Sequence, residues 1–118
     1  MAYTYLFFEP TRLPLISHEL GEATVRTLND ADAVKATLAR IFPAIEWADA
    51  DGRLLGRTQV EAGPVEFWLP APGHTLSMRC SLRADYSADV QHLCDQSGWL
   101  AFDERPMCLQ PGQAPIPA

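Results

Sequence analysis

The sequence predicts an α+β domain in which one antiparallel sheet of about five to six strands carries two helices on one face. Residues 85–98 have the pattern of a capped helix that ends at Gly98 and leads directly into an apolar strand, residues 99–103. Residues 75–83 alternate apolar and polar side chains, as expected for a strand with one buried and one solvated face. This strand–helix–strand unit offers the other elements a surface on which to pack.

The N-terminal part predicts a strand followed by a long connection. Residues 3–8 are aromatic and apolar on both faces, which indicates a central strand that is covered on both sides. Pro10 and Pro14 interrupt a regular ladder, so residues 10–17 are expected to be a surface loop. Residues 17–28 leave two alternatives, because part of the segment alternates like a strand and its start could open a short helix. We expect irregular structure with a short extended piece.

Residues 30–42 predict the first helix. Asn29 or Asp30 can cap its start, and Pro43 ends it because proline disfavours a helical predecessor. The apolar stripe at helical spacing consists of Val34, Leu38 and Ile41.

Three further strands are expected before the central strand–helix–strand unit, at residues 45–48, 53–61 and 65–69. Turn-forming sequences rich in Asp, Gly and Pro separate them, and the loop 70–74 follows. Gly56 is expected to mark a bulge in the second of these strands. Phe67 and Trp68 are expected to face opposite sides of the sheet.

The C-terminal part predicts a short edge pairing at residues 107–109 and then a flexible Pro-rich tail, residues 110–118. Residues 1–109 thus form a single domain with the order β-α-β-β-β-β-α-β, which is related to the ferredoxin-like plan with an added hairpin. In residues 75–83 the apolar positions Leu76, Met78, Cys80 and Leu82 are expected to face the core. The remaining sheet face would show Arg79 and Arg83, and a partner could lie there.

Composition restricts the classes of partner. The 118 residues carry nine basic and fifteen acidic side chains, for a net charge of −6. A surface of that sign disfavours nucleic acid and anionic membranes and favours a basic partner. The N-terminus lacks the pattern of a signal peptide, and no apolar run reaches the length of a bilayer span. Three widely spaced cysteines indicate reduced thiols and a cytoplasmic protein.

No residue is predicted to be catalytic, to bind a metal or to bind a cofactor. His92 and Cys94 lie two apart on a helix and point to different sides, so they cannot act as a base and a thiol. Cys80 and Cys94 are expected to be buried, whereas Cys108 could be exposed. The pair Asp103-Glu104 diverges at a strand end and is assigned to a turn.

Four residues are candidates for binding a partner. Trp68 could form part of an apolar patch on an open sheet face, although packing is the common role of a tryptophan. Asp85, Asp89 and Asp95 would lie around the outer half of the second helix, as a solvated face or as a docking surface for a basic protein.

Apolar positions in two segments resemble a pattern in small uncharacterised bacterial proteins. The segments are Leu38-x-x-Ile41-Phe42-Pro43-x-Ile45-x-Trp47 and Leu93-Cys94-x-x-x-Gly98-Trp99-x-Ala101-Phe102-Asp103. Some bacterial proteins of similar size and acidity are immunity proteins, which lie in the cytoplasm and block a toxic effector by binding it. The resemblance implies a binding role and assigns no functional residue.

Charge, motifs and resemblance together predict a non-enzymatic cytosolic binding protein, immunity-like, that masks a basic partner with acidic and aromatic surface. The alternative is a small-molecule-binding or enzymatic domain whose site lies between the sheet face and residues 10–28. In that case a pocket lined by His18, Arg79 or Arg83 is expected. A homodimer formed through a sheet face is a third prediction.

Overall fold

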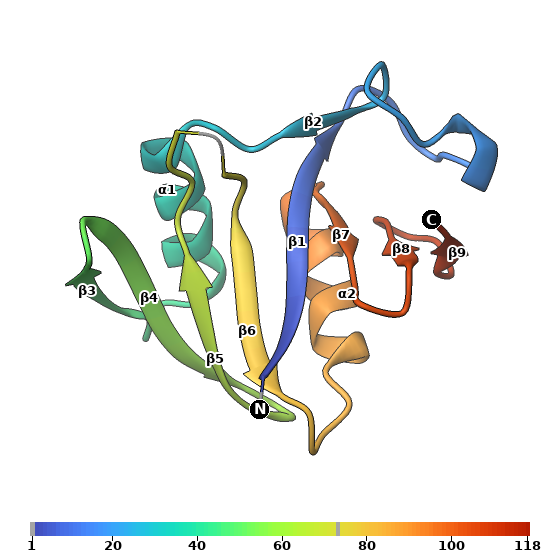
Figure 1. The fold of residues 1–118 in the computed structure, drawn as a ribbon. Coiled ribbons are helices and arrows are strands. Elements are labelled where there is room, and N and C mark those ends of the chain that lie inside the picture. The colour runs from blue at the N-terminus through green and yellow to red at the C-terminus, as the bar shows by residue number, and fades with distance from the viewer. Residues whose placement is uncertain (1, 73) are drawn as a thin grey trace.

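The first strand, β1 (Ala2–Pro10), lies in the middle of a single antiparallel sheet (Figure 1). The computed structural model describes residues 2–72 and 74–118. Met1, and Gly73 of the predicted loop 70–74, lie outside this description. Because β1 lies between β6 and β7 in the sheet, the prediction of a central strand at residues 3–8 is confirmed.

Strand β1 pairs with three other strands. Ala2 to Leu6 pair with β6 (Ser77–Ser81), and Phe8 to Pro10 pair with β2 (Val25–Thr27). The opposite edge of β1 pairs with β7 (Leu100–Phe102), so β6 and β7 flank β1 and α2 (Ser87–Ser97) connects them. The predicted strand–helix–strand unit is thus present, with β1 inserted between its two strands.

The predicted order β-α-β-β-β-β-α-β is present, but the sheet has nine strands instead of five to six, in the order β3-β4-β5-β6-β1-β7-β8-β9, with β2 beside β1. The extra strands β2, β8 and β9 are two or three residues long. The sequence indicated β2 as a short extended piece within residues 17–28 and β8 as a short edge pairing at residues 107–109, whereas β9 lies in the predicted tail. The remaining bounds are α1 (Ala31–Ile41), β3 (Glu46–Ala50), β4 (Arg53–Val60), β5 (Gly63–Trp68), β8 (Met107–Leu109), β9 (Ile116–Pro117) and a 3₁₀ turn (Ser17–Glu19).

Both helices cover the same face of the sheet, as predicted, and the main core lies between them and the sheet (Figure 1). Within this core the Phe7 and Phe67 rings are 6.4 Å apart between centroids. The helices contribute Val34 and Leu38 from α1, and Val90, Leu93 and Cys94 from α2. No helix among the described residues has the length and apolar content needed to cross a bilayer.

Local sequence signals account for where both helices begin and end. The Asp30 side chain accepts a hydrogen bond from the Ala33 N–H at 3.1 Å, and α1 ends before Pro43. Gly98 ends α2 with φ of 81°, and its N–H donates to the Cys94 carbonyl. At the start of α2, Asp85 Oδ1 accepts from both the N–H and the hydroxyl of Ser87.

The face of the sheet opposite the helices, here called the outer face, is partly covered by residues 11–24. Leu15, predicted to lie in a surface loop, is buried with Leu100 and Cys108 in a second, smaller apolar cluster. The expectation that β1 is covered on both sides holds only near its C-terminal end, where Phe8 packs against this cluster. Further back along the strand, Leu6 on the outer face is 41% exposed. The sequence missed this because an apolar strand does not reveal which face a loop covers.

Residues 110–118, predicted to be a flexible tail, lie against the sheet. Ile116 and Pro117 form β9, which pairs with β8, and the Ala118 N–H donates to the Pro106 carbonyl at 2.9 Å. Gln110, at the start of the segment, is 1% exposed. Ile116 supplies the apolar contact that holds this segment, since it packs against the outer-face cluster.

Two local predictions on the strands are wrong. Leu82 is 47% exposed instead of facing the core, because β6 ends at Ser81 and the alternation ends with it. Gly56 lies in regular pairing between Trp47 and Phe67 and forms no bulge. The glycine is needed for close packing, since a Cβ there would lie 2.7 Å from both Ile45 Cδ1 and the Trp47 ring.

We therefore expect Gly56→Ala to lower the free energy of unfolding by about 1–3 kcal/mol, because an added methyl group overpacks this side of the core. Urea unfolding followed by tryptophan fluorescence would measure the change. Gly21→Ala is the matched control, since a Cβ at Gly21 meets nothing within 4 Å. Equal stability of the two variants would contradict this account.

Candidate functional site

The four residues predicted to bind a partner do not form one surface. Trp68 lies on the outer face, next along β5 from the buried Phe67, whereas α2 covers the opposite face of the sheet. The Trp68 ring is half-buried beneath the Arg53 guanidinium, whose carbon is 5.8 Å from the ring centroid. Its expected orientation opposite to Phe67 is confirmed, but it is separated from the three aspartates.

The aspartates accept hydrogen bonds from the protein's own chain. The Asp89 carboxylate accepts from the Glu61 and Ala62 N–H groups at 3.2 and 3.1 Å, and so ties α2 to the turn before β5. Asp95 accepts from the Gly112 N–H at 2.8 Å and from the Gln91 amide at 3.0 Å, and these bonds lower its pKa. Asp95 follows Asp89 by six positions, which places the two side chains about 120° apart around the helix.

An apolar groove lies on the outer face between the sheet and residues 11–24, with a volume of about 480 Å³. It is open to solvent along one side. Its lining consists of Leu6, Phe8, Leu20, Gly21, Glu22, Val25, Phe102 and Ala118. This set, the outer groove, lies where the alternative prediction placed a site. His18, Arg79 and Arg83 do not line it, and Arg79 instead lines a separate hollow of about 470 Å³ beside β4, β5 and β6. The Phe8 and Phe102 rings meet edge to face at 5.4 Å.

A buried side chain from the far end of the sequence fixes the wall of this groove. Gln110 Oε1 accepts from the Leu15 N–H, and Gln110 Nε2 donates to the Leu15 carbonyl, both at 2.8 Å. The two bonds satisfy both main-chain groups of a residue that is 1% exposed. They hold residues 11–24 over the sheet, and the groove depends on that placement.

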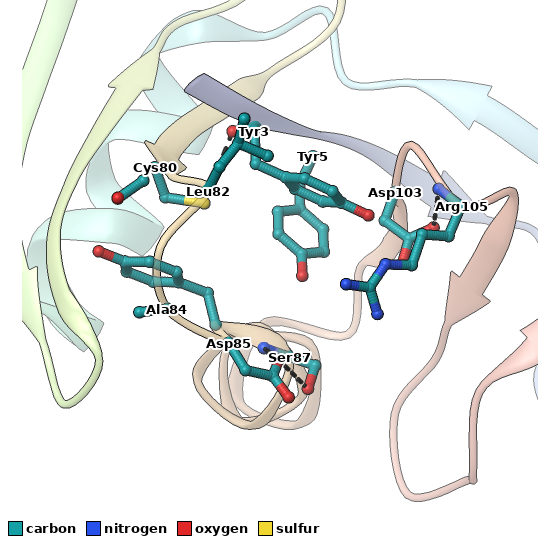
Figure 2. Close-up of a pocket in the computed structure, with 11 residues that line it drawn as sticks. Tyr3, Tyr5, Cys80, Leu82, Ala84, Asp85, Ser87, Asp103 and Arg105 are labelled. Atoms are coloured by element: carbon teal, nitrogen blue, oxygen red, sulfur yellow. Dashed lines mark hydrogen bonds between the residues drawn. The ribbon is translucent and has the colours of Figure 1, made fainter. Parts of the chain in front are cut away.

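A second, smaller pocket of about 120 Å³ lies at the start of α2 (Figure 2). Tyr3 and Tyr5 project into the space between the first residues of α2 and the turn that carries Asp103 and Arg105. The lining, here called the tyrosine pocket, consists of Tyr3, Tyr5, Cys80, Ser81, Leu82, Ala84, Asp85, Tyr86, Ser87, Asp103 and Arg105. Of the four predicted partner-binding residues, only Asp85 belongs to it.

The tyrosine pocket has a negative electrostatic environment. Burial, followed by the Asp103 charge, raises the pKa of Tyr3. Burial also raises the pKa of Tyr5, with further contributions from Tyr3, Cys80, Asp103 and Asp85. Hydrogen bonds from Ser87 lower the pKa of Asp85, so this carboxylate is ionised at neutral pH. The pocket therefore disfavours an additional negative charge.

The cysteines are not nucleophiles at neutral pH. Cys94 is fully buried, and burial raises the pKa of its thiol to about 12. Cys108 is also fully buried, and the expectation that it could be exposed is wrong because β9 and residues 11–24 cover it. Burial raises the pKa values of Cys80 and Cys108 to about 11. His92, two residues from Cys94, is exposed.

The acidic pair at the end of β7 accepts main-chain hydrogen bonds, Asp103 from its own turn and Glu104 from the distant strand β1. Glu104 Oε2 accepts from the Thr4 N–H at 2.6 Å, and Asp103 Oδ1 accepts from the Arg105 and Met107 N–H groups, each at 2.9 Å. Within residues 2–72 and 74–118, no three His, Cys, Asp or Glu side chains gather in a way that could hold a metal ion.

The alternative prediction placed a site where the outer groove lies but did not identify its lining, and the tyrosine pocket was missed, although each hollow left a signal in β1. Tyr3 and Tyr5 alternate with Leu6 and Phe8, so the same strand sends tyrosines to one side and apolar residues to the other. Alternation alone does not show which distant loops close over these side chains. No known family matches the chain, and no curated protein or solved structure is significantly similar to it. The function must therefore be argued from the structure itself.

We expect Gln110→Ala to lower the free energy of unfolding by about 2 kcal/mol or more, because it leaves the buried N–H and C=O of Leu15 without partners. It should also speed tryptic cleavage after Arg12, since residues 11–24 lose their anchor. Chemical denaturation and timed proteolysis would measure the two effects. Gln113→Ala, at an exposed position, is the control and should change stability by less than about 0.5 kcal/mol. Similar values for the two variants would contradict the anchoring role.

The thiols also predict a loss of stability at alkaline pH. The three thiols have raised pKa values in the folded state compared with the ordinary value of 9.0. Above that value the unfolded thiols release protons while the folded ones retain theirs, so the free energy of unfolding should fall between pH 9 and 11. Urea unfolding at stepped pH would measure this slope, with pH 6 to 8 as the reference range. A flat profile from pH 9 to 11 would contradict the buried, protonated state of the thiols.

Proposed function

We propose that this chain is a non-enzymatic binding protein that holds a basic partner protein against the outer face of its sheet. The observation that carries the proposal is the outer groove, an apolar hollow of about 480 Å³ bordered by the 41%-exposed Leu6. Apolar side chains that gather in an exposed hollow are a common feature of interaction sites. The one charged side chain in the groove lining is acidic, Glu22.

The shape of the groove favours a protein partner. Sites for small molecules usually enclose most of the ligand's surface, whereas this groove is open along one side. An apolar side chain from a partner could fill it while the surrounding surface excludes water, as at the centre of many interfaces. The adjoining outer face carries an exposed ion pair, Arg57 with Glu66 at 3.0 Å, which suits the polar rim of an interface.

The net charge of −6 supports a basic partner. Charge of this kind acts at long range, because it steers a partner of opposite sign and raises the association rate. An immunity-type role in the cytoplasm, in which the chain masks a toxic protein, is the specific form of this proposal. It is supported by the resemblance in the two apolar segments and by three free, buried thiols, which suit a reducing compartment.

An apolar small molecule is the second candidate for the outer groove. It is favoured by the lining, in which Phe8, Phe102, Leu20 and Val25 converge from the sheet and from the segment above it. A second copy of this chain could also cover the outer face. The following experiment separates these occupants.

We expect Leu6→Asp to abolish partner recovery, because a carboxylate in the groove cannot be buried against an apolar side chain. Leu13→Asp is the matched control, since Leu13 is 41% exposed, as Leu6 is, and lines neither the outer groove nor the tyrosine pocket. Tagged wild-type, L6D and L13D proteins would be used as baits in lysate of the source cell, and recovered proteins identified by mass spectrometry. The proposal requires a basic protein near stoichiometry with wild type and L13D, and none with L6D.

The other results would count against a basic partner on this face. Recovery by all three baits would place the partner elsewhere, and recovery of no protein by folded wild-type bait would favour the small molecule. If light scattering instead shows a dimer that L6D dissociates, the occupant is a second copy of the chain.

A further inference from the structure

All three tyrosines of the chain line a single pocket. Tyr3 and Tyr5 come from one side of β1, with ring centroids 5.3 Å apart and planes tilted by 55°. Tyr86 comes from the start of α2, where its hydroxyl donates to the Pro64 carbonyl at 3.2 Å. Converging aromatic rings present electron-rich faces, which attract cations.

The Tyr5 hydroxyl points into this pocket without a partner. Tyr5 is 4% exposed, and its hydroxyl makes no hydrogen bond with any residue that the structure describes. Figure 2 shows the hydroxyl directed towards the space between Ser87 and Arg105. The ring is buried while the hydroxyl lies at the pocket wall, so the hydroxyl is free to contact a group inside the pocket.

Two carboxylates border the same space, and each has an oxygen available. Asp85 Oδ1 is occupied by Ser87, and Asp103 Oδ1 is occupied by the N–H groups of Arg105 and Met107. The second oxygen of each carboxylate has no bond to the described residues. Against these two negative charges stands one guanidinium, Arg105, so the charged side chains in the lining sum to −1.

We propose that the tyrosine pocket is a binding site for an alkylammonium group. Its N–H bonds would reach the free oxygens of Asp85 and Asp103 and the Tyr5 hydroxyl, while its carbon chain packs against the tyrosine rings. The volume of about 120 Å³ accommodates such a group, since a single water needs only roughly 10–15 Å³ of the same kind of space.

The electrostatics exclude the opposite assignment, an anion at the start of α2. The Asp85 carboxylate already occupies that helix end through Ser87. Asp103 and Asp85 also raise the pKa of Tyr5, which means that their charges oppose a negative group at the pocket wall. A positive group benefits from the same charges. This site is on the helix side of the sheet and does not depend on the outer groove.

The chain's own tyrosines provide the probe. In protein with ¹³C-labelled tyrosine rings, titration with n-butylammonium at pH 7 should give saturable shifts of the ring signals, whereas n-butyrate should give none. The three labelled residues all line the pocket, so every signal reports on the site. Unsaturable shifts with butylammonium, or equal binding of butyrate, would overturn the proposal.

Variants test the assigned charges. Asp103→Asn and Asp85→Asn retain an oxygen for the local hydrogen bonds but remove the charge, and each should weaken butylammonium binding about tenfold. Asp95→Asn makes the same change in net charge outside the pocket and should bind as wild type. Arg105→Gln should tighten binding, because it removes a like charge; weaker binding would mean that the site takes an anion. Tyr5→Phe, which leaves the ring in place, should weaken binding through the lost hydroxyl contact.

The source of the ammonium group is settled by a second titration. Nα-acetyl-lysine methylamide presents a lysine side chain without other charges, and a free amine such as butylammonium lacks the peptide backbone. Tighter binding of the lysine derivative would assign the pocket to a lysine of a protein, and equal or weaker binding would assign it to a free amine. If neither ligand binds folded protein, the proposal is wrong whatever the outer groove holds.

Discussion

The hydrogen bonds of β1 to three other strands are the constraint on which the rest of the structure depends. They fix the strand in the centre of the sheet, with β6 and β2 along one edge and β7 along the other. Because successive side chains of a strand point to opposite faces, this placement also decides what lies on each side. Tyr5 and Phe7 enter the helix side, whereas Leu6 and Phe8 enter the outer face. A shift of one residue in register would exchange the linings of both hollows.

The outer face is divided by a loop that a distant residue holds in place. The Gln110 side chain makes both of its hydrogen bonds to Leu15, 95 positions away in the chain. A buried amide that satisfies a buried main chain in this way lets an irregular segment lie over apolar side chains without unpaired polar groups. The cover stops short of Leu6, so one part of the face becomes core and the adjoining part remains a groove. Coverage of the sheet, rather than its composition, therefore creates the candidate interface.

Local signals in the sequence predicted the elements that local interactions determine. The Asp30 cap, the stop at Gly98 and the alternation of Leu76, Met78 and Cys80 all act within a few residues, and each is confirmed. Long-range contacts were missed. Leu15 is buried by partners far along the chain, and Pro-rich residues 110–118 contain only Ile116 as a sign of pairing. The linings of the two hollows could not be found this way, because each hollow is closed by segments that meet only in the folded chain.

The acidic residues illustrate why charge counted along a sequence is a weak guide to a docking surface. Asp89 and Asp95 point away from the core, as the helical pattern requires, yet each accepts hydrogen bonds from main-chain N–H groups of another segment. A carboxylate used in this way stabilises the junction between α2 and its neighbours. Its charge still adds to the field of the whole molecule, which falls off over a Debye length of about 8 Å at physiological salt. A basic partner of the kind we propose would thus be attracted by residues that it need not touch, while Leu6 and Glu22 at the outer groove would determine where it binds.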